Sequence, residues 1–322
     1  MPSSRQSLLV RWCVIAAAMV TAASALAQSA AQGFAVERYV PTAPGAGWLV
    51  MDHLDLYGKL GAGVTLTSGY ARNPYSVASA DGTPSLRVVS NQAFVDVGMA
   101  VFYDRYRLSL NIADPLYSSG RSGIAAGYQF TAPSADPGKY PDKVTDFRLG
   151  LDARLLGDAH GPWRLGLGAQ LWVPSGERFL YATDGTFRAM FRSLVAGDVG
   201  MFTYAGHLGV HVRPLDESPV PGAPRGSELL FGVAGGYRFG AGCTCGTAVV
   251  LGPELFGETA FRNAFGKTST GVEALLTGRL HHIDDHGAQQ TFKLGLGTGI
   301  HAQFGAPEWR AVLAIEIHDR VR

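Results

Sequence analysis

Apolar residues occupy every second position in a series of short segments along most of the chain. In the stretch WRLGLGAQL, the apolar side chains are Trp163, Leu165, Leu167, Ala169 and Leu171, and the residues between them are polar or glycine. Successive side chains of a β-strand point to opposite sides, so strict alternation is typical of a strand with one apolar and one polar face. The pattern therefore predicts a strand here and wherever it recurs.

The alternation recurs in about twelve segments between residue 56 and the C-terminus, each long enough for the roughly 9–11 residues of a tilted strand that crosses a bilayer. Short connections, such as Asp104-Arg105, alternate with long ones, such as 114–143. This alternation of loop lengths is typical of transmembrane β-barrels, whose long loops we expect outside the cell. Pro253 lies inside the ninth segment, where we expect a bulge or a shifted boundary.

A soluble β-sandwich would show the same alternation, so the face that meets water has to be decided separately. Glycine occupies many polar-face positions, as in LGLGAQ and LGLGTG, and small inward residues let strands curve and close. Phe292 and Phe304 bound an apolar face that spans about 30 Å, which matches an aromatic-bounded membrane band. We therefore predict an all-β fold, a closed transmembrane antiparallel up-and-down barrel of about twelve strands. Trp172 does not fit an outward aromatic boundary, because strict alternation turns it into the lumen and no bulge that would turn it outward is visible in the sequence.

Charged and histidine side chains fall on the face opposite the leucines. An Arg or Lys on the lipid face would cost about 2–4 kcal/mol at the bilayer midplane, so we expect these side chains to line the lumen. They form either an ion-paired filling or a selective constriction. The candidate lumen-lining residues are Arg148, Asp152, Arg154, Arg164, His207, His211, Arg238, Glu254, Glu258, Glu273, Arg279 and Lys293.

Composition agrees with a membrane barrel. Charged residues are 16% of the 322 residues, against about 25% in soluble domains, and 42 residues are glycine. The net charge of +1 gives no electrostatic reason to expect a nucleic-acid partner. Two arginines, a short apolar core and Ala25-Leu26-Ala27 predict a cleaved signal peptide at 1–27. We expect a periplasmic lead-in at 28–49 and the barrel at 50–322.

Candidate chemistry is sparse. No histidine has a serine two positions later, the economical way to supply the nucleophile and base of an outer-membrane lipid hydrolase. His207 and His211 are about 13 Å apart along one strand, too far for one metal ion. We expect no catalytic residues, no metal and no cofactor. Cys243 and Cys245 leave open a plain turn, a strained disulfide or a weak metal site.

Several blocks resemble the N-terminal barrel region of OmpA-family outer-membrane proteins of the myxobacterial type. They include GFAVERYVPTAPGAGWLVMDHLDLYGKL, DFRLGLDARLLGD, PWRLGLGAQLWVPSGER and FGAPEWRAVLAIEI, and together the resemblance covers essentially the whole mature chain. Proteins of this kind often continue into Asp-rich repeats and a peptidoglycan-binding domain. This sequence contains no D-x-D-x-D-G run, so peptidoglycan binding is not expected from it.

The sequence predicts an integral outer-membrane barrel without catalysis, which has a structural role or acts as a passive channel for small solutes. The alternative is a barrel that binds or transports an apolar ligand, against which the charged inner face argues. Its expected partners are outer-membrane lipid and lipopolysaccharide, together with the barrel-assembly machinery during insertion.

Overall fold

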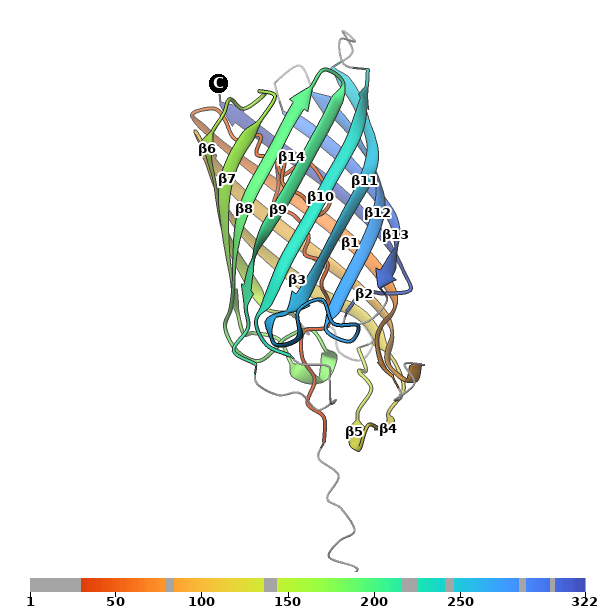
Figure 1. Ribbon diagram of the computed structural model, residues 1–322. Helices are drawn as coiled ribbons and strands as arrows, with labels where there is room; N and C mark the ends of the chain where they lie inside the picture. The colour runs from red at the N-terminus through yellow and green to blue at the C-terminus, as the bar shows by residue number, and fades with distance from the viewer. Residues whose placement is uncertain are drawn as a thin grey trace, which may run out of the picture.

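Twelve antiparallel strands close into a barrel in the computed structural model, which describes residues 30–78, 84–135, 144–215, 225–240, 246–283, 288–301 and 305–321 (Figure 1). The barrel strands are β1 (Leu60–Ala78), β2 (Pro84–Tyr103), β3 (Tyr106–Ser119), β6 (Phe147–Leu156), β7 (Arg164–Val173), β8 (Arg188–Val199), β9 (Phe202–Val212), β10 (Glu228–Phe239), β11 (Thr247–Ala260), β12 (Thr270–Ile283), β13 (Gln289–His301) and β14 (Trp309–Val321). Short elements outside the barrel are β4 (Gly123–Ala125), β5 (Tyr128–Phe130), and the 3-10 helices η1 (Arg178–Leu180) and η2 (Phe261–Asn263). No helix among these described residues is long and apolar enough to cross a membrane.

Each barrel strand pairs with its neighbours in the chain, and the first strand pairs with the last. The β1–β14 ladder runs in unbroken register from Leu60↔Val321 to Arg72↔Trp309, so no edge strand is left open. Closure satisfies the backbone N–H and C=O groups that hydrocarbon would leave unpaired. The predicted fold class and strand number are confirmed.

Exposure of the side chains decides which face points outward. In β7, Leu165 and Leu167 are 41% and 52% exposed, whereas Arg164 and Gln170 are 0% and 6% exposed. The same outward apolar face continues around the barrel in all twelve strands. The predicted orientation, with leucines outside and charges inside, is therefore confirmed, and Trp172 faces inward as alternation requires.

Exposed aromatic side chains gather near both rims of the barrel. Trp163 and Phe202 lie beside the short connections, where they are 50% and 47% exposed. At the long-loop end, the rings of Tyr70 and Trp309 are 5.0 Å apart. Two aromatic belts that flank an apolar band are typical of outer-membrane barrels.

The prediction of a bulge at Pro253 is wrong. Strand β11 keeps one register with β12 through this position, from Gly252↔Thr277 to Glu254↔Leu275. On the β10 side, a side chain at Gly252 would clash with the carbonyl oxygen of Gly235. Glycine therefore lets the two backbones approach closely here, and the ladder passes the proline without an inserted residue.

Residues 30–58, which we call the lumen segment, run through the inside of the barrel (Figure 1). The segment enters at the long-loop end, beside β4 and β5, and reaches Leu60 at the end with the short connections. Residues 30–49, which we expected as a periplasmic lead-in, lie inside the barrel, and strand β1 begins at Leu60, within the first alternating segment of the sequence. The predicted signal peptide, Phe304 and both cysteines lie outside the described residues.

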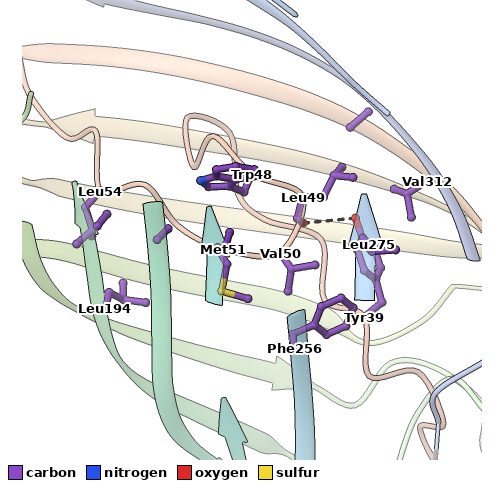
Figure 2. Packing of buried hydrophobic residues seen from close by; sticks show 14 of the residues in the cluster. Tyr39, Trp48, Leu49, Val50, Met51, Leu54, Leu194, Phe256, Leu275 and Val312 are labelled. Atoms are coloured by element: carbon purple, nitrogen blue, oxygen red, sulfur yellow. Dashed lines mark hydrogen bonds between the residues drawn. The ribbon is translucent and has the colours of Figure 1, made fainter. Parts of the chain in front are cut away.

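Apolar side chains of the lumen segment pack against inward-facing side chains of the strands (Figure 2). Trp48, Met51 and Leu54 are fully buried, and their neighbours in the cluster include Phe256 of β11 and Leu275 of β12. Full burial of such a side chain contributes about 1.5–3 kcal/mol. The barrel therefore has a small hydrophobic core in the place where a porin has water.

Candidate functional site in the barrel lumen

All twelve predicted lumen residues lie on the inward side of their strands. Ten are buried, while His207 and Arg238 are half-buried. They do not form one site, because ion pairs divide them into separate groups along the lumen. What connects these groups is the lumen segment, to which most of them bind.

Glu254 of β11 holds the middle of the lumen segment. Its carboxylate accepts backbone N–H groups from Leu49 at 2.9 Å, Val50 at 2.9 Å and Met51 at 3.0 Å. The hydroxyl group of Thr277 in β12 donates a fourth hydrogen bond at 2.8 Å. Successive N–H groups that converge on one anion form a strong, charge-assisted cradle. The fully buried carboxylate of Glu254 is therefore the central anchor of the segment.

Arg107 of β3 joins the lumen segment to the wall. Its guanidinium group contacts Asp52 of the segment and lies 2.7 Å from the carboxylate of Asp152 in β6. Asp152 also contacts Arg192 of β8 at 3.1 Å. All four side chains are buried, so removal of one would leave a charge without its partner in a dry environment.

Two further anchors lie toward the short connections. The backbone N–H of Gly45 donates to Glu316 of β14 at 2.8 Å, and Glu316 pairs with Lys293 of β13 at 2.8 Å. The ring of His53 lies 2.7 Å from the hydroxyl group of Thr203 in β9. These contacts satisfy polar groups of the lumen segment. Irregular backbone at membrane depth is tolerated only where protein or water surrounds it, and here the barrel wall surrounds it.

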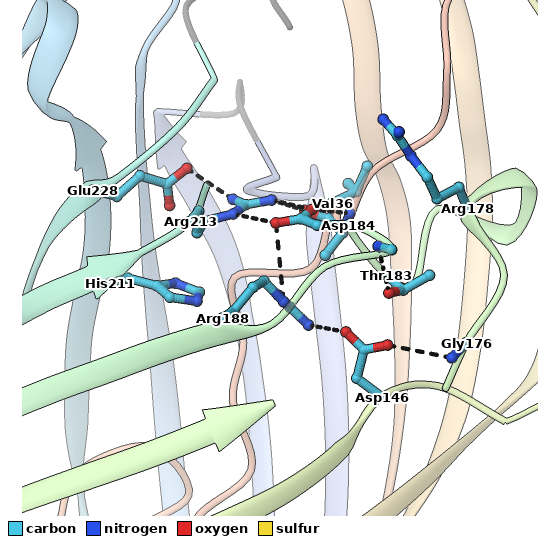
Figure 3. A network of polar contacts seen from close by, with 12 residues as sticks. Val36, Asp146, Gly176, Arg178, Thr183, Asp184, Arg188, His211, Arg213 and Glu228 are labelled. Atoms are coloured by element: carbon cyan, nitrogen blue, oxygen red, sulfur yellow. Dashed lines mark hydrogen bonds and ion pairs between the residues drawn. The ribbon is translucent and has the colours of Figure 1, made fainter. Parts of the chain in front are cut away.

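A polar network holds the segment at the long-loop end (Figure 3). Asp184, in the β7–β8 loop, accepts the backbone N–H of Ala35 at 2.8 Å and pairs with Arg213 at 2.7 Å. Arg213 also pairs with Glu228 of β10 at 2.8 Å. Although burial opposes it, the Arg213 guanidinium holds the pKa of Asp184 well below its usual range. Asp184 thus remains a carboxylate that joins a loop, a strand end and the lumen segment.

Aromatic side chains cover the point where the segment enters. Arg225 stacks over the ring of Phe34, 3.6 Å from its centroid, and donates to the hydroxyl group of Tyr75 at 2.9 Å. The backbone N–H of Ala31 donates to the carbonyl of Gln129 in β5 at 2.8 Å. The β4–β5 hairpin and the segment are therefore fastened to each other.

Three potential metal ligands lie together near this end. Ligand atoms of His211, Glu228 and Glu258 lie within 4.8 Å of one another. Arg38 of the segment contacts Glu228 at 3.0 Å and Glu258 at 3.4 Å, and Arg213 contacts Glu228 as well. The guanidinium groups supply the positive charge that these carboxylates need, so we assign no metal to the cluster.

Besides a small cavity of about 20 Å³, two larger ones lie beside the segment in the described part of the lumen. One, of about 100 Å³, lies toward the long loops and is lined by Tyr39, Trp172 and His211 among others. The other, of about 330 Å³, lies toward the short connections and is lined by His53 and Arg279 among others. No lining residue is common to the two. Between them the segment and its apolar cluster fill the barrel.

Sequence reasoning missed several buried charges, including Arg188 and Arg192 of β8 and Arg310 of β14. The inward faces of these two strands also carry apolar residues, such as Leu194 and Val312, and these obscure the alternation. The inward apolar residues pack against the lumen segment, which explains the irregular pattern. Alternation within YRLSLNI was a clear signal for one missed residue, Arg107.

Known proteins provide a comparison for this fold. No family model and no curated protein sequence matches the chain. Among solved structures, an outer membrane channel from Pseudomonas putida F1 aligns with a TM-score of 0.51 and 12% identity, covering 83% of this chain and 97% of its own. The chain has the fold of an outer-membrane β-barrel. The CymD monoaromatic hydrocarbon channel aligns with a TM-score of 0.45, 10% identity and coverage of 89% and 99%. A FadL homologue from Pseudomonas aeruginosa aligns with a TM-score of 0.43, 9% identity and coverage of 90% and 100%.

Proposed function

We propose that this chain is a non-catalytic outer-membrane barrel that acts as a passive channel for small solutes, and that the lumen segment holds it closed. The observation that carries the proposal is that wall charges also pair with one another. Lys293 pairs with Glu316 at 2.8 Å, and Arg310 of β14 with Glu273 of β12 at 2.8 Å. With the segment withdrawn, the wall would keep a paired, water-compatible lining, and the ladder of strands would remain closed.

The size of the barrel supports this function. Twelve strands enclose a lumen wider than that of a packed eight-stranded barrel and narrower than that of a porin of 16 or more strands. The lumen segment fills this extra width. A solute path therefore depends on whether the segment can leave.

A permanent scaffold is the second candidate. The apolar cluster around Trp48, Leu49 and Met51 is buried as thoroughly as a protein core, which favours a fixed filling. Transport of an apolar ligand is less well supported, because the walls of the lumen carry many buried charges.

Conductance across a planar bilayer distinguishes a channel from a scaffold. The test compares wild-type protein with Glu254→Gln, which places an amide NH2 group against the N–H groups of the lumen segment. We expect rare openings in the wild type and much longer ones in the variant. Glu308→Gln, at an exposed surface pair with Arg87, is the matched control and should behave like the wild type. If wild type and Glu254→Gln are equally silent, the scaffold is the correct function.

We also propose that the barrel resides in the outer membrane, surrounded by its lipid and lipopolysaccharide and inserted by the barrel-assembly machinery. The outward belt of leucines and the aromatic rims support this location. We propose further that the chain is related to the barrel region of the OmpA family, which several of its sequence blocks resemble. Fractionation of cells on a sucrose gradient tests the location, and recovery in the soluble fraction would contradict it.

A further inference from the structure

The cavity of about 100 Å³ lies between the lumen segment and the wall. Tyr39 and Pro41 of the segment form one side, while Phe94 of β2, Trp172 of β7 and His211 of β9 form the other. Its volume equals that of a few water molecules at about 30 Å³ each, and it is somewhat smaller than a cavity of about 150 Å³ that accepts benzene. A solute of roughly four to six heavy atoms therefore fits.

The charges around the cavity are already balanced. Four carboxylates line it, and each contacts an arginine, two of which line the cavity as well. The pairs are Asp96–Arg148 at 3.7 Å, Asp146–Arg188 at 2.9 Å, Glu258–Arg38 at 3.4 Å and Glu37–Arg310 at 2.6 Å. A charged ligand would need a counter-charge that these pairs already use, so the cavity favours a neutral one.

Two neutral polar atoms at the cavity have no hydrogen-bond partner. They are Oε1 of Gln92 and Nε2 of His211, whose side chains are 5% and 3% exposed. Nδ1 of His211 lies 3.4 Å from the carboxylate of Glu258, which assigns the ring proton to Nδ1 and makes Nε2 an acceptor. Both atoms therefore lack a donor, and a buried polar group without a partner is costly.

Apolar side chains also line the cavity. The ring of Trp172 stacks on His211 with centroids 5.1 Å apart, and Phe94 and Pro115 extend the apolar surface. We propose that the cavity is a binding site for a small neutral hydroxyl compound of the short-chain alcohol class. Its hydroxyl group donates to Gln92 or His211, and its carbon chain lies against the apolar side.

Fluorine NMR on the whole protein in lipid nanodiscs tests the site, with 2,2,2-trifluoroethanol as the probe. We expect a saturable change in the fluorine resonance beyond that seen with empty nanodiscs. Gln92→Leu and His211→Leu each remove one acceptor, and each should weaken binding by roughly fivefold. His207→Leu is the matched control, because His207 lies on the same strand and face but does not line the cavity. It should leave the affinity unchanged.

A second probe separates hydrogen bonding from simple filling. 2,2,2-Trifluoroethyl methyl ether keeps the apolar part but has no donor, so it should bind more weakly than the alcohol. Equal binding of both probes, equal affinity in all variants, or no saturable signal would each overturn the proposal. Circular dichroism confirms that each barrel is folded, and Gln92→Leu keeps the test valid if His211→Leu does not fold. The outcome is independent of channel function, because binding is measured without conductance.

Discussion

Glu254→Gln should release the middle of the lumen segment while the barrel stays intact. In the wild type, each carboxylate oxygen of Glu254 accepts two hydrogen bonds. Glutamine keeps one oxygen and replaces the other with an NH2 group, which is a donor that faces two donors. At least two charge-assisted hydrogen bonds are lost, and each is worth about 1.5–3 kcal/mol. The segment should therefore lose about 3–6 kcal/mol of local stability.

Hydrogen–deuterium exchange measures this loss directly. A decrease of about 3 kcal/mol corresponds to roughly 150-fold faster exchange, since each 1.4 kcal/mol is a factor of ten. We expect this acceleration at the amides of Leu49, Val50 and Met51 and no change in the strands. Thr277→Val removes only the hydrogen bond that comes from the wall, so it should accelerate these amides by less than about tenfold. Unchanged exchange at Leu49–Met51 in Glu254→Gln would refute the assignment of Glu254 as the anchor.

Three further predictions concern other parts of the molecule. Arg107→Leu leaves Asp52 and Asp152 without their shared arginine, so it should lower the free energy of unfolding by about 3–5 kcal/mol and lower the thermal transition of the barrel. Arg87→Leu, at an exposed pair, should change the free energy of unfolding by less than about 1 kcal/mol. Because the pKa of Asp184 is depressed, its contribution is complete above the ordinary value of about 3.9 and is lost as pH falls through the folded value. Cleavage of the β7–β8 loop by pepsin should therefore stay slow at pH of about 4 and accelerate in stronger acid, and Asp184→Asn should be cleaved rapidly throughout. In a chain with Cys243 and Cys245 replaced by serine, Gln32→Cys should react with an impermeant maleimide on intact cells, because Gln32 is exposed at the long-loop end. Asp158→Cys is exposed beside a short connection and should not react with the maleimide.

Lipid makes the outward face predictable from the sequence. Most outward positions must be apolar, so alternation identified the strands and their orientation. The inward face has no such uniform requirement. Met190 of β8 faces inward and packs against Val40 of the lumen segment, so that strand reads as irregular. The alternation placed twelve charged or histidine residues on the inward face, but their partners were not predictable, because many of the partners come from the lumen segment.

The lumen segment itself left no periodic signal. Its backbone pairs partly with side chains of distant strands, such as Glu254 and Glu316, and partly within short irregular turns of its own, such as the N–H of His53 with the carbonyl of Ala46 at 2.7 Å. A stretch of this kind looks like an ordinary exposed linker, because glycine and proline interrupt it and no period appears. The strands and loops of the folded barrel supply polar groups that its burial requires.

The place where the lumen segment is tethered gives opening a direction. The segment is covalently continuous with β1 at the rim of short connections, while its other end emerges among the long loops. To clear the lumen in this direction, the segment and the chain that precedes it must pass through the whole barrel toward the rim of short connections. A folded domain attached ahead of residue 30, at the long-loop end, would be too wide to pass through the barrel. Such a fusion would leave the strands assembled, and the lumen segment would keep the lumen closed.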